Sequence, residues 1–341
     1  MPKPNHILVI RLSAMGDVAM TVPVLRAFTN QYPEIKLTVL TRPFFTPFFR
    51  DIPNITVVSA DIKGKHKGVF GLYKLSKELK TLNIDSIADL HNVLRSKILK
   101  FFLFGKRVVQ IDKGREEKKA LVNGQSFKQL KTTHQRYADV FEKLGYPIDL
   151  SQPNFPKKEN LKEKFIKIIG NDSKPWIGIA PFAAFDCKMY PLDLMTTVIE
   201  TLSKDYKVLL FGAGNEEKII LNTLANQGDN IINLAGQFSL SEELDIISNL
   251  DLMLAMDSGN AHIAAMLGVK VITVWGVTHP YAGFLPFNTT LDSAILADRI
   301  TYPKIPTSVY GNKCPEDYEN AMRTIAPGTI ISKINKTLNL S

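Results

Sequence analysis

Short apolar runs alternate with amphipathic segments along nearly the whole chain, and this alternation constrains the fold more than any other feature. An apolar run of strand length, followed by apolar residues at intervals of three and four, is typical of a strand–helix unit. Repetition of such units predicts an α/β protein with parallel sheets. The strands expected in the first half are His6–Leu12, Lys36–Thr41, Ile55–Ala60, Ser86–Leu90 and Arg107–Asp112. Those expected in the second half are Trp176–Pro181, Lys207–Ala213, Ile231–Ala235, Leu252–Asp257 and Val269–Gly276.

The helical segments fall between these strands, and polar breaks divide the chain in two. The helices expected first are Val18–Gln31, Gly71–Leu82, Val93–Phe104, His134–Leu144 and Glu159–Ile169. The later ones are Leu192–Leu202, Glu216–Ala225, Ser241–Leu250, Ala261–Leu267 and Pro327–Leu340. Proline-containing polar sequence lies around residues 147–158 and again at 170–175, where we place the domain boundary. We therefore expect one doubly wound domain over residues 1–165, a second over 170–322, and a C-terminal helix in 323–341.

The net charge of +9 is unevenly distributed. Residues 1–150 carry a balance of +12 and residues 151–341 a balance of −3, and 18 basic against 6 acidic side chains lie in residues 63–136. Such asymmetry indicates that the first domain meets an anionic partner, namely nucleic acid, an anionic membrane face or an acidic substrate, unless the lysines form only a solvated surface. Since no aromatic–basic recognition motif accompanies the charge, we expect no nucleic-acid partner.

Cysteine usage and hydropathy indicate a cytoplasmic protein. The two cysteines, Cys187 and Cys314, cannot make a disulfide framework and suit a reducing compartment. The first apolar run, Ile7–Ile10, is cut short by Arg11 and lacks a cleavage site, so it is no signal peptide. No apolar stretch approaches the roughly 18–20 residues that span a bilayer. We expect a protein that can touch a membrane and does not cross one.

The first candidate site is Ser13-Ala-Met-Gly-Asp17, between the first strand and the first helix. This position is at the carboxyl end of the strand, where open α/β sheets bind their ligands. Asp17 could serve as a helix N-cap. It could also be a general base that takes a proton from an incoming hydroxyl.

The second candidate site is Met256-Asp-Ser-Gly-Asn-Ala-His262, again a strand, a short turn and a helix. Backbone N–H groups at the start of that helix suit phosphate oxygens. Asp257 and Ser258 could instead cap the helix, and His262 in its first turn could be a structural histidine.

Two further loops are expected at the same edge of the second sheet. Lys188 follows the first strand of this domain and could neutralise a diphosphate, although a lone loop lysine is usually solvated. Gly276 and Thr278 follow the last predicted strand and could approach the same ligand. A third segment, Phe211-Gly-Ala-Gly214, lacks the third glycine and the ribose-binding acid of a dinucleotide fingerprint, so nicotinamide chemistry is disfavoured.

Other catalytic classes have no support in the sequence. The two cysteines stand alone, no His/Cys/Asp/Glu cluster has metal-ligand spacing, and H-E-x-x-H and C-x-x-C are absent. G-x-S-x-G is absent as well. We expect neither a metal site nor a serine nucleophile.

Taken in order, these motifs resemble glycosyltransferase family 9, the bacterial heptosyltransferases of the lipopolysaccharide inner core. The motifs that carry the resemblance are Ile7-Leu-Val-Ile-Arg-Leu-Ser-Ala-Met-Gly-Asp-Val18 with Thr21–Arg26, Ala88-Asp-Leu-His-Asn-Val-Leu-Arg-Ser96, Pro181–Pro191, Met256–His262 and Trp275-Gly-Val-Thr-His-Pro280. They cover nearly the whole chain in the order typical of the family. No single motif is specific, whereas the ordered set is.

The resemblance implies a GT-B fold, in which two Rossmann-like domains face a central cleft and the final helix crosses back to the first domain. It implies inverting, metal-independent transfer of heptose from ADP-heptose, with no cofactor. By position, Asp17 would be the base, and Ser13, His91 and Arg95 would lie on the acceptor side. The donor residues would be Lys188, Asp257, Ser258, Gly259, His262, Gly276 and Thr278. The implied acceptor is an anionic glycolipid at the inner membrane, and the basic residues of 63–136 would attract it.

Some positions depart from the family pattern. Ala183 and Ala184 stand where small hydroxyl residues are frequent, Tyr190 replaces a tryptophan, and Ala321 stands where a second C-terminal cysteine might fall. Two alternatives therefore stay open: a glycosyltransferase of this fold that uses another nucleotide-sugar, and a non-catalytic protein that binds a sugar nucleotide or a glycolipid.

Overall fold

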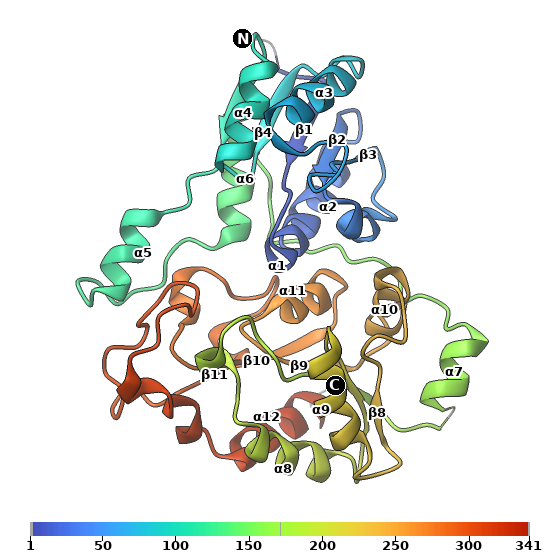
Figure 1. The fold of residues 1–341 in the computed structure, drawn as a ribbon, viewed down its shortest axis with the longest axis vertical. Coiled ribbons are helices and arrows are strands. Elements are labelled where there is room, and N and C mark those ends of the chain that lie inside the picture. The colour runs from blue at the N-terminus through green and yellow to red at the C-terminus, as the bar shows by residue number, and fades with distance from the viewer. Residues whose placement is uncertain (1–2, 171, 340–341) are drawn as a thin grey trace. The chain divides into compact units, whose positions relative to one another are not determined.

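The computed structural model describes residues 3–170 and 172–339, which form two compact units. Of the described residues, those up to Lys113 and the segment Lys131–Phe155 form unit 1. Gly114–Leu130 and the residues from Pro156 onward form unit 2. The chain leaves unit 1 for the last time at Phe155, so Pro156–Phe165, which the sequence placed in the first domain, belongs to unit 2. Gly114–Leu130 also belongs to unit 2, although it precedes this point in the sequence (Figure 1).

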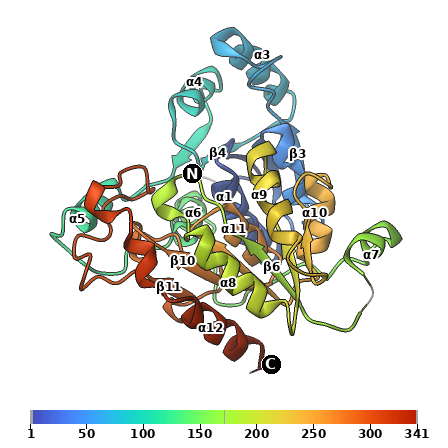
Figure 2. The same ribbon diagram turned by 60° about the horizontal axis from the view of Figure 1, so that its bottom comes forward.

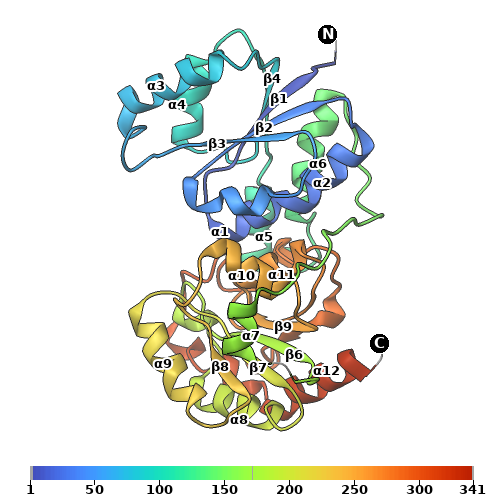
Figure 3. The same ribbon diagram turned by 90° about the vertical axis from the view of Figure 1, so that its right-hand side faces the viewer.

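Unit 1 is built on a parallel sheet of strand order β3-β2-β1-β4-β5. Its strands are β1 (His6–Ile10), β2 (Lys36–Thr41), β3 (Ile55–Ser59), β4 (Ser86–Asp89) and β5 (Arg107–Gln110). Its helices are α1 (Met15–Ala19), α2 (Thr21–Gln31), α3 (Gly68–Lys80), α4 (Leu94–Phe102) and α6 (Thr133–Leu144), and a 3₁₀ helix spans Pro43–Phe49. α2 and α6 cover one face of the sheet, and α3 and α4 cover the other (Figure 3). Strands with helices on both faces must be apolar on both sides, which is why they read as continuous apolar runs.

Unit 2 is a second parallel sheet of order β11-β10-β9-β6-β7-β8. Its strands are β6 (Trp176–Ala180), β7 (Lys207–Leu210), β8 (Ile231–Asn233), β9 (Leu252–Met256), β10 (Lys270–Trp275) and β11 (Ala294–Leu296). Its helices are α5 (Arg115–Val122), α7 (Glu163–Ile169), α8 (Leu192–Leu202), α9 (Asn215–Ala225), α10 (Leu240–Ile247), α11 (Gly259–Met266) and α12 (Pro327–Asn339). Two doubly wound α/β units confirm the fold class that the alternation predicted, and they are the two Rossmann-like domains that the resemblance implied.

The last helix belongs to unit 2, which differs from the expectation that it returns to the first domain. α12 packs beside α8 (Figure 2). Its side chains Ile330 and Ile334 are fully buried in the core that also holds the strands of unit 2. Tyr206 Oη adds a 3.0 Å hydrogen bond to Asn335 Oδ1. The apolar stripe of α12 is therefore used within its own unit.

The two ends of α6 follow local capping chemistry. Thr132 caps α6, since its Oγ1 accepts a hydrogen bond from Gln135 N at 3.2 Å. Gly145 ends the same helix with a φ of +104°, a backbone conformation that glycine adopts without steric cost. The segment expected to be one helix over Val18–Gln31 is instead two short helices, α1 and α2, which divide at Met20.

Among the α-helices and strands of the described residues, α5 and β11 were not expected from the sequence. α5 lies in a charged segment without a continuous apolar face, and β11 has only three residues at the edge of the second sheet. Within the described part of the chain, no helix is long and apolar enough to cross a membrane.

Candidate active-site residues

The topology of unit 1 brings two loops to the same edge of its sheet. β1 and β4 are parallel neighbours, and Ile10 pairs with Asp89 at their carboxyl ends. The segment after β1, which contains Asp17, and the segment after β4, which contains His91, therefore leave the sheet side by side. This is the edge where doubly wound folds bind their ligands.

Asp17 forms an ion pair in this first loop. Its Oδ2 lies 2.5 Å from Arg11 Nη2 and also accepts a 3.2 Å hydrogen bond from Ala14 N. The N-cap of α1 is Ala14 and not Asp17, which sits in the first turn of the helix. The Asp17 side chain keeps 31% of its surface exposed, whereas that of Arg11 keeps 7%. One carboxylate oxygen is thus held by the protein while the group stays accessible.

Arg11 is fixed by contacts that the sequence did not reveal. Its Nη1 donates a 2.7 Å hydrogen bond to Leu90 O, and its guanidinium lies 5.9 Å from the ring centroid of Tyr137. Tyr137 Oη in turn lies 3.2 Å from Asp17 O, within hydrogen-bonding distance. The signal that could have found Arg11 is a cation at the end of a buried strand, where a charge needs a partner. We call Arg11, Ser13, Asp17, His91 and Tyr137 the Asp17 cluster.

His91 and Ser13 meet in this cluster, and Arg95 does not join them. Ser13 Oγ lies 3.5 Å from His91 Nε2. Burial, and then the positive charges of Arg11 and Lys113, lower the pKa of His91 to about 4, so the ring is neutral near pH 7. Arg95 is exposed on α4 and has no polar contact with these residues.

In unit 2, three loops leave the sheet at the carboxyl ends of adjacent strands. β9 lies between β6 and β10 and is parallel to both. The segments that follow these strands contain the candidate residues Lys188, Asp257 and Thr278, which lie far apart in the sequence. Their approach is a consequence of strand order.

Lys188, Asp257 and Thr278 form a buried polar group. Lys188 Nζ lies 2.8 Å from Asp257 Oδ2, and Thr278 Oγ1 donates a 2.9 Å hydrogen bond to the same oxygen. The Lys188 side chain is 11% exposed and that of Asp257 is 9% exposed. The lysine is therefore not a solvated surface charge. A buried ion pair of this kind requires good geometry, since both charges lose most of their hydration.

The N-terminus of α11 lies directly after Asp257. Ser258 occupies the N-cap position, but its side chain makes no cap hydrogen bond. Its Oγ is buried and has no hydrogen-bond partner among the residues that the structure describes. Gly259 is the first helical residue, so the N–H groups of the first turn have no intrahelical acceptor. His262 is buried in the same helix. We call Lys188, Asp257, Ser258, Gly259 and Thr278 the Lys188 cluster.

Two glycines allow close packing around Lys188. A Cβ at Gly311 would clash with the Lys188 side chain, and its φ of +83° also favours glycine. A Cβ at Gly276 would clash with Cys187 O. Gly276 is thus needed for loop packing. Gly311 was not singled out from the sequence, because a turn-forming sequence does not indicate which residue the glycine packs against.

Cys187 and Cys314 form a disulfide, which corrects the expectation that the two cysteines stand alone. They are separated by 127 residues in the sequence, and their Cα atoms lie 6.2 Å apart. The bond joins the loop that carries Lys188 to the loop that carries Gly311. Sequence spacing could not predict this pairing, because two cysteines in distant loops meet only through the tertiary fold.

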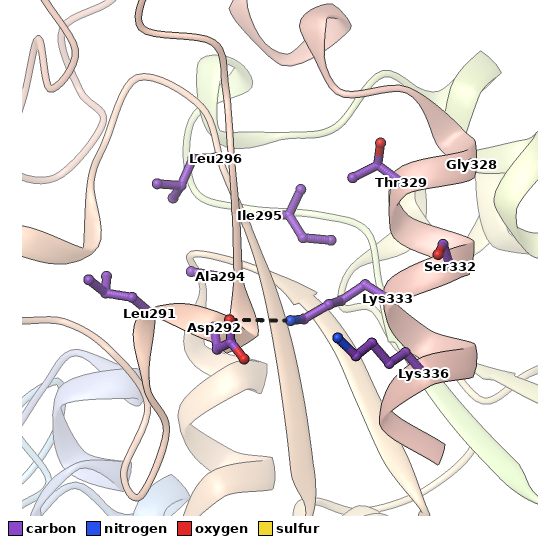
Figure 4. A pocket seen from close by; sticks show the side chains of 10 residues that line it. All are labelled: Leu291, Asp292, Ala294, Ile295, Leu296, Gly328, Thr329, Ser332, Lys333 and Lys336. Carbon is purple, nitrogen blue, oxygen red and sulfur yellow. Dashed lines mark ion pairs between the residues drawn. The ribbon is translucent and has the colours of Figure 1, made fainter. Parts of the chain in front are cut away.

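A pocket of about 700 Å³ lies elsewhere in unit 2, between β11 and α12 (Figure 4). An ion pair of 3.8 Å between Lys333 and Asp292 crosses it. None of the candidate residues lines this pocket. Across residues 3–170 and 172–339, no group of three or more His, Cys, Asp or Glu side chains could hold a metal ion.

Known proteins are similar to this chain over nearly its full length. Residues 72–304 match the family model of glycosyltransferase family 9 (heptosyltransferase). Lipooligosaccharide heptosyltransferase 2 of Haemophilus influenzae is 29% identical, over 98% of this chain and 99% of that protein. Among solved structures, a family 9 glycosyl transferase from Veillonella parvula has a TM-score of 0.78 at 20% identity, covering 99% of this chain and 98% of its own.

A second solved structure, the E. coli ADP-heptose lps heptosyltransferase II, has a TM-score of 0.70 at 20% identity and covers 98% of this chain and 99% of its own. At these identities the two structures support the fold, and the family match supports the class of enzyme. The chain belongs to glycosyltransferase family 9 and is a glycosyltransferase.

Proposed function

We propose that this enzyme transfers a heptose from ADP-heptose to a hydroxyl of a lipopolysaccharide inner-core acceptor, with inversion at the anomeric carbon and without a metal ion. The observation that carries the proposal is the Lys188 cluster, where a buried cation and the N-terminus of α11 lie beside a carboxylate. The names of the relatives supply the sugar, the nucleotide and the acceptor.

The Lys188 cluster suits the donor diphosphate. Lys188 can donate hydrogen bonds to phosphate oxygens while it stays paired with Asp257, because an ammonium has three donors. The N–H groups at the start of α11 and the buried Ser258 Oγ provide further donors. These groups would stabilise the negative charge that develops on the leaving diphosphate, a task that metal ions perform in other enzymes.

Asp257 suits the sugar of the donor. Its Oδ2 is used by Lys188 and Thr278, which leaves Oδ1 as an acceptor for sugar hydroxyls. Thr278 acts as a positioning residue, since its hydroxyl holds the carboxylate in place. Gly276 is also a positioning residue, because the lack of a side chain lets its loop pack closely against Cys187.

The Asp17 cluster suits the acceptor and the proton transfer. Asp17 takes the proton from the acceptor hydroxyl, the hydroxyl oxygen forms a bond to the anomeric carbon, and the bond from that carbon to the diphosphate breaks. Arg11 orients Asp17 through the 2.5 Å ion pair. Ser13 and neutral His91 offer hydrogen bonds to the acceptor sugar, and exposed Arg95 offers a charge to its phosphate groups.

A donor panel tests the sugar and the nucleotide. The enzyme is incubated with a lipopolysaccharide-core acceptor and with ADP-heptose, ADP-glucose, UDP-sugars or GDP-sugars, and acceptor-dependent nucleotide release is measured. We expect ADP-heptose to give the highest kcat/KM. Preference for a UDP- or GDP-sugar would overturn the heptose proposal, and binding without turnover across the panel would indicate a non-catalytic protein.

A further inference from the structure

The outer surface of α3 carries exposed aromatic residues next to lysines. Phe70, Tyr73, Lys74 and Lys77 recur at helical spacing on the side opposite to the buried residues of this helix. Phe70 is 91% exposed. Lys77 Nζ lies 4.7 Å from the ring centroid of Tyr73. A helix that is apolar on its buried side and both aromatic and basic on its outer side needs an explanation beyond the core of unit 1.

α4 repeats this pattern. Leu94, Lys97 and Phe101 lie three and four residues apart along its outer side, and Phe104 follows just after the helix ends. The exposed fractions are 73% for Leu94, 76% for Phe101 and 82% for Phe104. Three large apolar side chains within eleven residues are thus left in solvent.

The two helices form one surface of unit 1. They lie on the same face of the sheet (Figures 1 and 3), and the rings of Tyr73 and Phe102 are 5.3 Å apart between their centroids. Lys80 Nζ lies 5.7 Å from the ring centroid of Phe104, which joins the two C-terminal ends. We call the exposed apolar and basic residues of α3, α4 and the turn to Phe104 the α3–α4 face.

The charge around this face is predominantly positive. Residues 61–112 contain eleven lysines and arginines and five acidic residues, of which Asp89 is fully buried and paired with Lys100 at 2.6 Å. Glu78 is already paired with Lys65, at 2.6 Å. An anionic partner is therefore complementary to the face, and a cationic or neutral one is not.

We propose that the α3–α4 face docks on an anionic lipid bilayer. Aromatic side chains of this kind enter the boundary between head groups and acyl chains, while neighbouring lysines contact the anionic head groups. The apolar side chains are spread over two helices on an outer face, an arrangement suited to a bilayer surface. This inference goes beyond the proposed function, because such a face would hold the enzyme on a membrane whichever sugar it transfers.

Vesicle flotation tests the proposal on the full chain. Wild-type protein is mixed with vesicles of phosphatidylethanolamine and phosphatidylglycerol, or of phosphatidylcholine alone. We expect binding to the anionic vesicles that weakens as salt rises, and at least tenfold weaker binding to the neutral ones. The Phe70→Ser/Phe101→Ser double variant should bind anionic vesicles at least tenfold more weakly than wild type. Ile300→Ser, at a position 92% exposed in unit 2, is the matched control and should bind like wild type.

Further readouts separate this proposal from the sugar chemistry and from misfolding. The double variant should melt like wild type and should retain wild-type turnover with a lipid-free acceptor. Absence of wild-type binding to anionic vesicles, or equal binding by the double variant, would overturn the docking face. Capture by an acidic protein without vesicle binding would overturn it too. If wild type does not turn over ADP-heptose, the proposed function is contradicted, and the flotation result still supports the docking face.

Discussion

The two units each place an aspartate beside a cation at the carboxyl edge of a sheet, and the two pairs differ in exposure. Asp17 is paired with Arg11 and remains 31% exposed, whereas Asp257 is paired with Lys188 and is 9% exposed. An accessible carboxylate can receive a proton from an incoming hydroxyl. A buried pair, with Thr278 on the same oxygen, is instead held in one geometry and suits the binding of a ligand. The difference suggests that chemistry belongs to the first pair and donor binding to the second.

The largest expected effect is the loss of turnover when Asp17, the exposed aspartate of the two pairs, is replaced. Asp17→Asn keeps the size of the side chain and removes the base, so we expect kcat to fall by about 10³-fold or more while donor affinity stays within about twofold. Steady-state kinetics and calorimetric titration of the donor measure the two quantities. Asp139→Asn, on α6 of the same unit, is the matched control. Near-normal turnover of Asp17→Asn would eliminate Asp17 as the base.

Removal of Lys188 should weaken donor binding, which Asp17→Asn should leave nearly unchanged. Lys188→Met should weaken donor binding by at least tenfold, because the diphosphate loses its cation. It should also lower the free energy of unfolding by about 3–5 kcal/mol, because the charge of Asp257 is left buried and unpaired. Titration and chemical denaturation measure these effects, with the exposed Lys204→Met as control. Unchanged donor affinity in a folded Lys188→Met protein would contradict the assignment.

The third prediction concerns the disulfide Cys187–Cys314, which lies next to Lys188 in unit 2. The Lys188 loop is tied to the loop of Gly311 by Cys187–Cys314, and the residues of the Asp17 cluster have no covalent link. Cys187→Ser/Cys314→Ser, or reduction by a dithiol, should lower the stability of unit 2 by about 2–4 kcal/mol. Calorimetry with and without reductant measures the change. Identical melting in both conditions would show that the bond does not stabilise the fold.

The last prediction is a pH dependence that both units share. Burial is the main cause that lowers the pKa of His91 in unit 1, and of His279 in unit 2, to about 4. As pH falls, the two histidines of the unfolded chain are protonated near the ordinary pKa of 6.5, whereas those of the folded chain are protonated only near 4. The free energy of unfolding therefore decreases as pH falls from about 6.5 to about 4. Denaturation at several pH values measures the slope. His91→Gln and His279→Gln should each reduce it, and an unchanged slope in both variants would contradict this cause.

Much of the fold follows from local sequence. Every strand that was expected has a counterpart in the structure, because buried parallel strands are marked in the sequence by apolar runs. Most of the observed strands are shorter than expected by a residue or more at one or both ends. β2 (Lys36–Thr41) has the expected bounds. β11 escaped detection because three residues at a sheet edge leave too short a pattern.

The candidate site follows from sequence only in part. Motif position identified Asp17, Lys188 and Asp257, but the pairing of the last two depends on the order β6, β9 and β10 in the sheet. The roles of Arg11 and of the two cysteines depend on tertiary contacts as well. The charged segment Gly114–Leu130 joins unit 2, where the rings of Phe127 and His279 lie 4.9 Å apart, and local charge could not predict this.

This assignment also sharpens the charge asymmetry. With Gly114–Leu130 counted in unit 2, unit 1 carries a balance of +10 and unit 2 a balance of −1. The excess thus lies in the unit that holds the proposed base and the α3–α4 face. A phosphorylated acceptor and an anionic bilayer would both be attracted to it.

The most direct measurement is mass spectrometry of the acceptor, combined with NMR of the anomeric proton and carbon of the product. Wild-type enzyme is incubated with ADP-heptose and a defined lipopolysaccharide-core acceptor, and Asp17→Asn is run in parallel. The account predicts that the acceptor gains one heptose of inverted anomeric configuration with wild type, and none at a comparable rate with Asp17→Asn. A product of retained configuration, or equal product from both proteins, would contradict it.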